Sequence, residues 1–335
     1  MSRTGAVPAP DAATGRGVLL LVGMPRSGTT WTGKLLDAHP ATRYLHEPDS
    51  ARRIPVGLAA ETAGPAEAAA VREWLRAALA DRSARVNGKL PLFRKRWRGP
   101  VEELRHRASV YLAKLAARRG VARPVHVGRR AEGAPAVWKS IESLARLGAL
   151  LEALPELRVA VLVRHPCGYV ASVLRGERAG RFSDTVPAAD DWGVLERLLA
   201  TQAARAIGVT RRDLAAEPAE GRLAWRWVLA HAAALAAAAR AGGGRVRLVR
   251  YEDCCRDPAA AAGTMLGLIG LGLHPQVRRF AAASTRGDGG GYYGVRRDPA
   301  RAAARWREEL PAAVQRRVLA IVREAAPPPL HAEAA

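Results

Sequence analysis

The chain contains only three cysteines, Cys167, Cys254 and Cys255. Three thiols cannot build a disulfide framework, and adjacent cysteines rarely bond to each other. Their spacing also lacks the paired Cys or His positions that are typical of a zinc site. The sequence therefore excludes a small disulfide-stabilised fold, and we expect buried thiols and no bound metal.

Long apolar runs are absent as well. The only early run, Val18–Val22, is too short to cross a bilayer or to form the apolar segment of a signal peptide. We therefore predict a soluble, cytoplasmic protein. Aromatic residues make up only 5% of the chain, and no nucleic-acid-binding motif is present. We predict no nucleic-acid partner for this reason.

Acidic residues are outnumbered: 31 Asp and Glu face 53 Lys and Arg, which gives a formal net charge of +22. Half of this excess lies in residues 89–130, where 13 Arg and Lys face Glu102 and Glu103, a net charge of +11. A solvated helical face would explain such a stretch. The functional interpretations are an anionic acceptor and a peripheral contact with an anionic membrane surface.

Short apolar runs alternate with helical patterns along the chain. The expected strands are residues 18–23, 42–46, 135–138, 158–163 and 245–250. The expected helices include 29–38, 142–153, 166–175 and 258–271, and residues 190–241 are expected to form a helical stretch. This alternation predicts an α/β fold whose parallel sheet is flanked by helices on both faces.

One domain accounts for this pattern. We assign it to residues 17–325, with helical insertions on the acceptor side at 60–130 and 185–241. The composition of residues 1–16 and 326–335, which are rich in Ala and Pro, predicts a disordered leader and a disordered tail.

A phosphate-binding loop follows the first strand. Gly23 and Gly28 have the spacing of a Walker-type loop, but Thr29 stands where that loop requires lysine. Without the lysine, the loop is poorly suited to a γ-phosphate and its Mg²⁺. Backbone amides at the start of the next helix can still hold a phosphate, together with the side chains of Arg26, Ser27, Thr29 and Thr30. The pattern predicts a nucleotide whose single 5′-phosphate carries a transferable group.

A second anion-binding pattern begins where the fourth strand ends. The apolar run Val159–Val163 stops at Arg164, Pro166 suits the first turn of a helix, and Ser172 lies eight residues after the arginine. A guanidinium offers a planar fork for phosphate, and a hydroxyl adds another donor. A GTPase or ATPase would place a metal-binding Asp at this strand end, so the pattern argues against a triphosphate enzyme.

These two motifs together resemble those of the sulfotransferases. The run Pro25–Trp31 looks like the loop with which these enzymes hold the 5′-phosphosulfate of 3′-phosphoadenosine 5′-phosphosulfate (PAPS). Arg164 and Ser172 match the pair that grips the 3′-phosphate of the same nucleotide. The resemblance covers roughly residues 17–310. It implies a P-loop-type sheet, PAPS as the sulfuryl donor and no metal.

The resemblance extends to three later residues. Tyr251 lies in an Arg-Tyr-Glu-Asp sequence similar to the strand-end motif whose tyrosine approaches the nucleotide in this family. Further nucleotide contacts are implied for Ser284 and for Arg305, which precedes Trp-Arg. The glycines within 287–294 suggest a lid that orders on cofactor binding, although an ordinary disordered loop has the same composition.

Sulfuryl transfer needs a base for the acceptor hydroxyl and cations beside the departing phosphate oxygen. Glu47, 21 residues after Arg26, is placed like the catalytic glutamate of the tyrosylprotein sulfotransferases and is the expected base. His46 is the alternative, and only one of the two can face the acceptor, because neighbouring strand residues point to opposite faces. The expected cations are Arg26 and Lys139, the latter through its similarity to a catalytic lysine of those enzymes. Simple ion pairing of Glu47 with Arg26 or Arg43, and a solvated Lys139, are the structural alternatives.

The sequence thus predicts a PAPS-dependent sulfotransferase. The residues around Glu47 resemble the carbohydrate branch, which favours a glycan, a glycolipid or a glycosylated small molecule as acceptor, and the basic stretch 89–130 favours an anionic one. Two alternatives stay open. One is a P-loop nucleotide kinase, against which Thr29 and Arg164 argue. The other is an inactive anion-binding member of the same fold.

Overall fold

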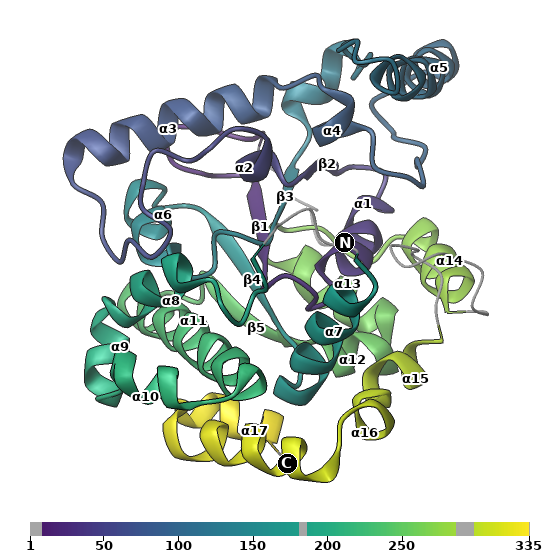
Figure 1. The fold of residues 1–335 in the computed structure, drawn as a ribbon. Coiled ribbons are helices and arrows are strands. Elements are labelled where there is room, and N and C mark those ends of the chain that lie inside the picture. Colours follow the sequence, from purple (N-terminus) through teal and green to yellow (C-terminus); the bar gives the residue numbers. More distant parts are fainter. Residues whose placement is uncertain (1–8, 181–185, 286–297, 335) are drawn as a thin grey trace, which may run out of the picture.

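A computed structural model describes residues 9–180, 186–285 and 298–334 (Figure 1). Within these ranges, five parallel strands form one sheet in the order β2-β3-β1-β4-β5. The strands are β1 (Val18–Val22), β2 (Arg43–His46), β3 (Ala136–Ser140), β4 (Arg158–Val163) and β5 (Val246–Arg250). The α/β fold with a parallel sheet that the sequence predicts is confirmed.

Helices cover both faces of the sheet, as strands that are buried on both sides require. Leu20 and Val22 of β1 belong to one apolar core, whereas Leu19 and Leu21 belong to the other. The first core contains residues of α3 (Pro65–Ala80), α6 (Leu147–Ala153), α7 (Pro166–Arg178), α8 (Trp192–Leu199), α11 (Ala219–Ala241) and α17 (Ala312–Ala325). The second contains residues of α1 (Thr29–Asp37), α12 (Tyr251–Arg256), α13 (Pro258–Gly267) and α14 (Pro275–Ser284).

The remaining elements are short or peripheral. They are α2 (Pro48–Ala51), α4 (Ala84–Asn87), α5 (Pro100–Ala117), η1 (Arg129–Gly133), α9 (Gln202–Ile207), α10 (Arg211–Ala216), α15 (Pro299–Ala304), α16 (Trp306–Glu309) and η2 (Pro328–Ala334). The insertion 60–130 therefore holds α3, α4 and α5, and α5 projects at the upper edge of the molecule in Figure 1. Across the described ranges, no helix combines the length and the apolar character needed to span a bilayer.

One expected helix begins later in the structure. The helix expected at 142–153 begins only at Leu147, because the amides of Glu142 and Ser143 donate to the Ser140 hydroxyl oxygen (3.1 and 3.0 Å) and form a turn. The helical stretch expected at 190–241 consists of α8, α9, α10 and α11. The breaks follow from local signals, since Thr201 and Thr210 cap new helices through their side chains.

The two ends that the sequence predicts to be disordered are described in part, at residues 9–16 and 326–334. Residues 11–16 form a turn in which Asp11 accepts the Ala13 amide (2.9 Å), and the Thr14 carbonyl accepts the Glu156 amide (2.7 Å). At the other end, η2 packs on α17 and buries Leu330. Composition could not predict this, because a single leucine anchors a segment that is otherwise rich in Pro and Ala. The three cysteines are buried free thiols, as predicted.

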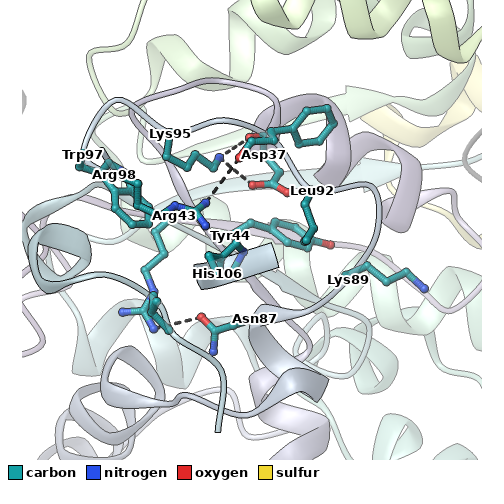
Figure 2. A pocket seen from close by; sticks show the side chains of 12 residues that line it. Asp37, Arg43, Tyr44, Asn87, Lys89, Leu92, Lys95, Trp97, Arg98 and His106 are labelled. Carbon is teal, nitrogen blue, oxygen red and sulfur yellow. Dashed lines mark hydrogen bonds and ion pairs between the residues drawn. The ribbon is translucent and has the colours of Figure 1, made fainter. Parts of the chain in front are cut away.

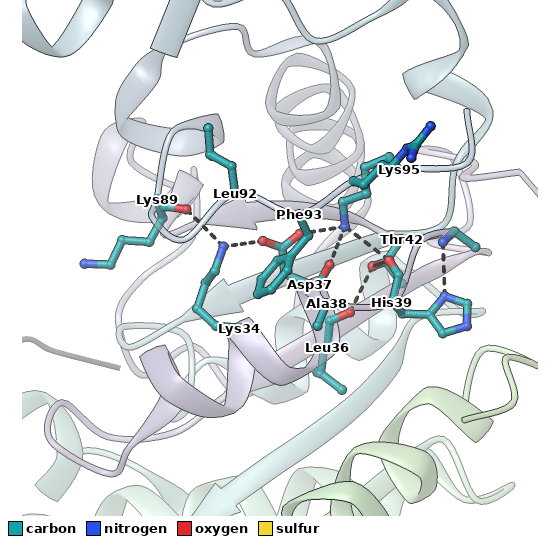
Figure 3. A network of polar contacts seen from close by, with 12 residues as sticks. Lys34, Leu36, Asp37, Ala38, His39, Thr42, Lys89, Leu92, Phe93 and Lys95 are labelled. Atoms are coloured by element: carbon teal, nitrogen blue, oxygen red, sulfur yellow. Dashed lines mark hydrogen bonds and ion pairs between the residues drawn. The ribbon is translucent and has the colours of Figure 1, made fainter. Parts of the chain in front are cut away.

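A buried ionic network ties the basic segment after α4 to the end of α1 (Figure 3). Lys34 and Lys95 both donate to the Asp37 carboxylate, Lys95 at 2.8 Å. Lys34 also donates to the Lys89 carbonyl (2.9 Å), and Lys95 donates to the His39 carbonyl (3.2 Å). The two ammonium groups and the carboxylate are almost fully buried. The network therefore fixes the course of residues 89–95 across α1.

Burial and charge act in opposite directions on this network. Burial lowers the pKa of the Lys95 ammonium to about 8. Burial alone would raise the pKa of the Asp37 carboxyl, but Lys34 and Lys95 hold it below its usual value. Asp37 is thus the carboxylate that offsets the desolvation of both lysines.

Replacing Asp37 by Asn should destabilise the protein strongly, because two buried ammonium groups would lose their counter-charge. We expect the free energy of unfolding to fall by about 3–5 kcal/mol, measured by urea denaturation. The matched control is Glu73→Gln, which removes a carboxylate from an exposed pair with Arg76 and should change little. Equal effects of the two substitutions would contradict this account of the network.

Candidate active site

The carboxyl ends of all five strands meet at one edge of the sheet, because the strands are parallel. The segment 23–28 leaves β1 there and enters α1, and Arg164 and Tyr251 directly follow β4 and β5. Ligands in open α/β sheets bind at this edge. The topology therefore collects residues that are widely separated in the sequence.

The loop after β1 has a strained and close-packed backbone. Gly28, which precedes the first residue of α1, has φ of 91°, and Arg26 has φ of 73°. A Cβ atom on Gly28 would lie 2.3 Å from Cε2 of Tyr251, and one on Gly23 would lie 2.7 Å from the carbonyl oxygen of Leu162. Both positions therefore require glycine. The loop turns sharply between the end of β1 and the start of α1.

Polar groups in this loop include a donor with no partner. The Ser27 hydroxyl is fully buried and makes no hydrogen bond to any residue that the structure describes. Thr29 is also buried, and Thr30 is half-buried. A buried hydroxyl without a partner is costly. A bound anion at the start of α1 would satisfy it.

Arg164 and Ser172 lie against the loop after β1. Arg164 Nη1 donates to the Arg26 carbonyl (2.8 Å), and Arg26 Nε donates to the Ser172 hydroxyl oxygen (3.3 Å). The Arg164 guanidinium lies over the Tyr251 ring, 4.9 Å from its centroid. Arg164 Nε is buried and has no hydrogen-bond partner among the described residues. Four predicted site residues from three strand ends thus form one cationic cluster.

Ser284 contacts the first turn of α1, and Arg305 is linked to Ser172 through Glu309 and Arg175. Trp31 Nε1 in the first turn of α1 donates to the Ser284 hydroxyl oxygen (3.1 Å). Arg305 is half exposed and pairs with Glu309 at 2.5 Å. Glu309 also pairs with Arg175, whose Nη2 donates to the Ser172 hydroxyl oxygen (3.4 Å). Residues 287–294, for which the sequence suggests a lid, lie outside the described ranges.

Glu47 and Lys139 form the second centre at this edge. Glu47 follows the last residue of β2, and in the sheet register His46 is opposite Lys139. The Lys139 ammonium donates to the Glu47 carboxylate, and the Glu47 amide donates to the Lys139 carbonyl (2.9 Å). Lys139 is only 1% exposed, whereas the Glu47 side chain is 23% exposed. Solvent can therefore reach the carboxylate but hardly the ammonium.

The geometry excludes two structural alternatives from the sequence. Lys139 is not a solvated cation, and burial lowers the pKa of its ammonium while Glu47 opposes that shift. Arg43 does not pair with Glu47, because its guanidinium donates to the Asp81 carbonyl (2.9 Å) and to Asn87 Oδ1 (3.1 Å).

His46 lies beside Glu47, contrary to the alternation expected within a strand. Glu47 has already left the strand and has φ of 49°, so its carboxylate turns back and lies 3.9 Å from His46 Nε2. The Tyr44 hydroxyl is 3.0 Å from the other ring nitrogen. Burial, followed by the charge of Lys139, lowers the pKa of His46 to about 2. The imidazole is therefore a weak base at neutral pH.

Asp49, which the sequence analysis did not identify, holds the segment after Glu47 against the end of β3. Asp49 is buried and accepts hydrogen bonds from Ser140, from Ser143 (2.7 Å) and from Trp138 Nε1 (3.3 Å). These contacts fix α2 against the end of β3 and hence Glu47 against Lys139. The signal in the sequence was the acidic residue two positions after Glu47, together with the serines that follow Lys139.

A small cavity is lined by residues of the basic segment and of β2 (Figure 2). Its lining includes Tyr44, Lys89, Arg98 and His106, and its volume is about 30 Å³. A water molecule occupies a similar volume in the liquid. The cavity is thus too small for a sugar or a nucleotide.

About half of the chain matches the model of a protein family. A model described as "Sulfotransferase family" matches residues 19–193. Carbohydrate sulfotransferase 5 of Mus musculus is 39% identical over 79 residues, which are 22% of this chain and 20% of that protein. Carbohydrate sulfotransferase 6 of Homo sapiens is 37% identical over 83 residues, which are 22% of this chain and 20% of that protein. The chain thus covers about a fifth of the length of these relatives.

Solved structures are similar over greater lengths but at lower identity. The sulfotransferase domain from the curacin biosynthetic pathway is 15% identical, with a TM-score of 0.45 and coverage of 93% of this chain and 99% of that one. A mouse sulfotransferase complexed with PAP is 11% identical, with a TM-score of 0.42 and coverage of 96% and 90%.

Gly28→Ala should disturb the loop, because the new Cβ would meet the Tyr251 ring at a positive φ. We expect a loss of about 2 kcal/mol or more of unfolding free energy. Thermal unfolding followed by circular dichroism measures it. Gly272→Ala is the matched control, since a Cβ there would meet no atom within 4 Å. A Gly28→Ala protein as stable as this control would show that the loop is not constrained as described.

Proposed function

We propose, from the premise that this chain belongs to the sulfotransferase family, that it transfers a sulfuryl group from PAPS to an acceptor hydroxyl. The observation that carries the proposal is the cluster in which Arg164 bonds the Arg26 carbonyl and Arg26 bonds Ser172. This cluster lies at the sheet edge where α1 begins. It concentrates cationic donors around a loop that lacks the lysine of a triphosphate site.

The residues of the loop fit the two anionic groups of this donor. Ser27, Thr29, Thr30 and the amides of α1 are suited to the 5′-phosphosulfate, and the buried Ser27 hydroxyl would gain a partner. Arg164 and Ser172 are suited to the 3′-phosphate, since Arg164 Nε is a buried donor with no partner among the described residues. When bound, PAPS supplies the sulfuryl group.

Glu47 is the proposed base for the acceptor hydroxyl. Its carboxylate is partly exposed, whereas His46 has a pKa of about 2 and holds a proton poorly. Lys139 orients this carboxylate through the ion pair. Once Glu47 takes up a proton, the Lys139 charge is no longer neutralised by its partner. Lys139 and Arg26 can then stabilise negative charge that develops at the sheet edge.

The proposed acceptor is the hydroxyl of a glycan, a glycolipid or a glycosylated small molecule. The support is the local identity with two proteins named carbohydrate sulfotransferases, and the Glu-Pro sequence at the end of β2. The basic residues around Lys89 and Arg94 would favour an anionic acceptor.

Donor binding is tested by calorimetric titration with 3′-phosphoadenosine 5′-phosphate, with AMP and with ATP·Mg²⁺. We expect the 3′-phosphorylated nucleotide to bind most tightly. In Arg164→Ala, its affinity should fall by about 10-fold to 100-fold, because a charge-assisted hydrogen bond to phosphate is lost. AMP should lose much less, and it thus serves as the internal control for folding. Equal losses for both nucleotides would remove Arg164 from the 3′-phosphate site, and preference for ATP·Mg²⁺ would contradict the proposed function.

Glu47→Gln tests the base. The amide cannot accept the proton at neutral pH, so turnover with labelled PAPS should fall on the order of 10²-fold or more. Binding of 3′-phosphoadenosine 5′-phosphate should stay close to that of the wild type. His46→Asn is the matched comparison and should retain most of the turnover. If Glu47→Gln were as active as the wild type and His46→Asn were not, the base would be His46.

A further inference from the structure

Helix α5 exposes an apolar face to solvent. The large apolar side chains on this face are at least half exposed, with Leu104 at 69%, and they are Val101, Leu104, Tyr111, Leu112 and Leu115. Their spacing of three, four and seven residues puts them on one side of the helix. Most of the exposed large apolar side chains in the described ranges lie on α5. A contiguous apolar face of this kind marks an interaction site.

The opposite face of α5 already anchors the helix to the protein. Val110 and Ala113 are buried in a small core with Val125 and Val127. His106 Nδ1 is 2.7 Å from the His126 carbonyl oxygen. The inward face is thus sufficient to hold α5 in place. The outward face contributes nothing to the fold that would explain its apolar character.

The positive charge around the apolar face of α5 indicates which kind of partner it can bind. Arg105, Arg118, Arg119 and Arg123 are exposed, and none of them forms an ion pair with a described residue. The stretch 89–130 that contains α5 carries a net charge of +11. A second copy of the same face would be repelled by this charge. An apolar stripe bordered by arginines instead matches the interface of an anionic lipid bilayer.

We propose that the outward face of α5, together with the arginines beside it, docks on an anionic membrane surface. The leucines would enter the boundary between headgroups and acyl chains, and the arginines would contact anionic headgroups. The helix would lie in the plane of the interface, since its inward face stays bound to the protein. This proposal is independent of sulfuryl transfer, because it concerns a surface outside both candidate centres.

Docking would bring the Glu47 centre towards the membrane. His106 on the inward face of α5 and Tyr44 line the same cavity (Figure 2). The Tyr44 hydroxyl in turn lies 3.0 Å from His46 Nδ1. This consequence rests on the proposed function: an acceptor carried by a lipid would then be presented beside the candidate base.

The test is flotation of the full-length protein with phosphatidylcholine vesicles that contain or lack phosphatidylglycerol. The wild type should bind only the anionic vesicles. In the double variant Leu104→Gln, Leu112→Gln, vesicle binding should fall by about tenfold or more, because the apolar contact is removed. The matched control is Leu248→Gln, an exposed leucine on β5, which should bind like the wild type. Circular dichroism checks that each variant keeps its helix content.

A second set of variants tests the charge separately. Replacing Arg105, Arg118 and Arg119 by Gln should weaken binding by about fivefold for each arginine, and salt should weaken binding of the wild type. The proposal is overturned if the wild type does not float with anionic vesicles, or if it binds neutral vesicles equally well. It is also overturned if the leucine variants change only the oligomeric state, which would make α5 an interface between protein chains.

Discussion

All strands of the sheet run in the same direction, so their carboxyl ends meet at a single edge, and both candidate centres depend on this arrangement. Gly28 and Arg26 follow β1, Arg164 follows β4, and Tyr251 follows β5. Packing enforces their proximity, because Tyr251 fills the space that a side chain at Gly28 would need. The edge can hold cationic groups close together because backbone carbonyls accept their hydrogen bonds.

A second constraint on the structure is the burial of three lysines. Arginine greatly outnumbers lysine in this chain, yet Lys34, Lys95 and Lys139 are almost completely buried. Each contacts a carboxylate, Asp37 for the first two and Glu47 for the third. The two settings differ in solvent access. The Asp37 network is closed and holds loop 89–95 in place, whereas the Glu47 carboxylate is partly open to solvent.

The basic insertion has two faces with different roles. On its inner side, Lys95 pairs with Asp37 at the end of α1, and Arg98 pairs with Glu103 of α5. Its outer side combines apolar residues of α5 with exposed arginines. The net charge of the insertion is therefore not evenly distributed. Only the tertiary structure separates the cations that are neutralised by carboxylates from those that face solvent.

Local patterns in the sequence were enough to predict the parallel α/β fold, the loop at Gly28, and the positions of Arg164 and Ser172 after β4. Buried strands, left-handed turns and strand-end arginines each have a short-range signature. Three features were decided only in three dimensions: the Glu47–Lys139 ion pair, the support from Asp49, and the outward face of α5. Each depends on contacts between segments far apart in the chain. The burial that lowers the pKa of His46 and the exposure of Leu104 both arise only when the chain folds. No local sequence pattern predicts either of them.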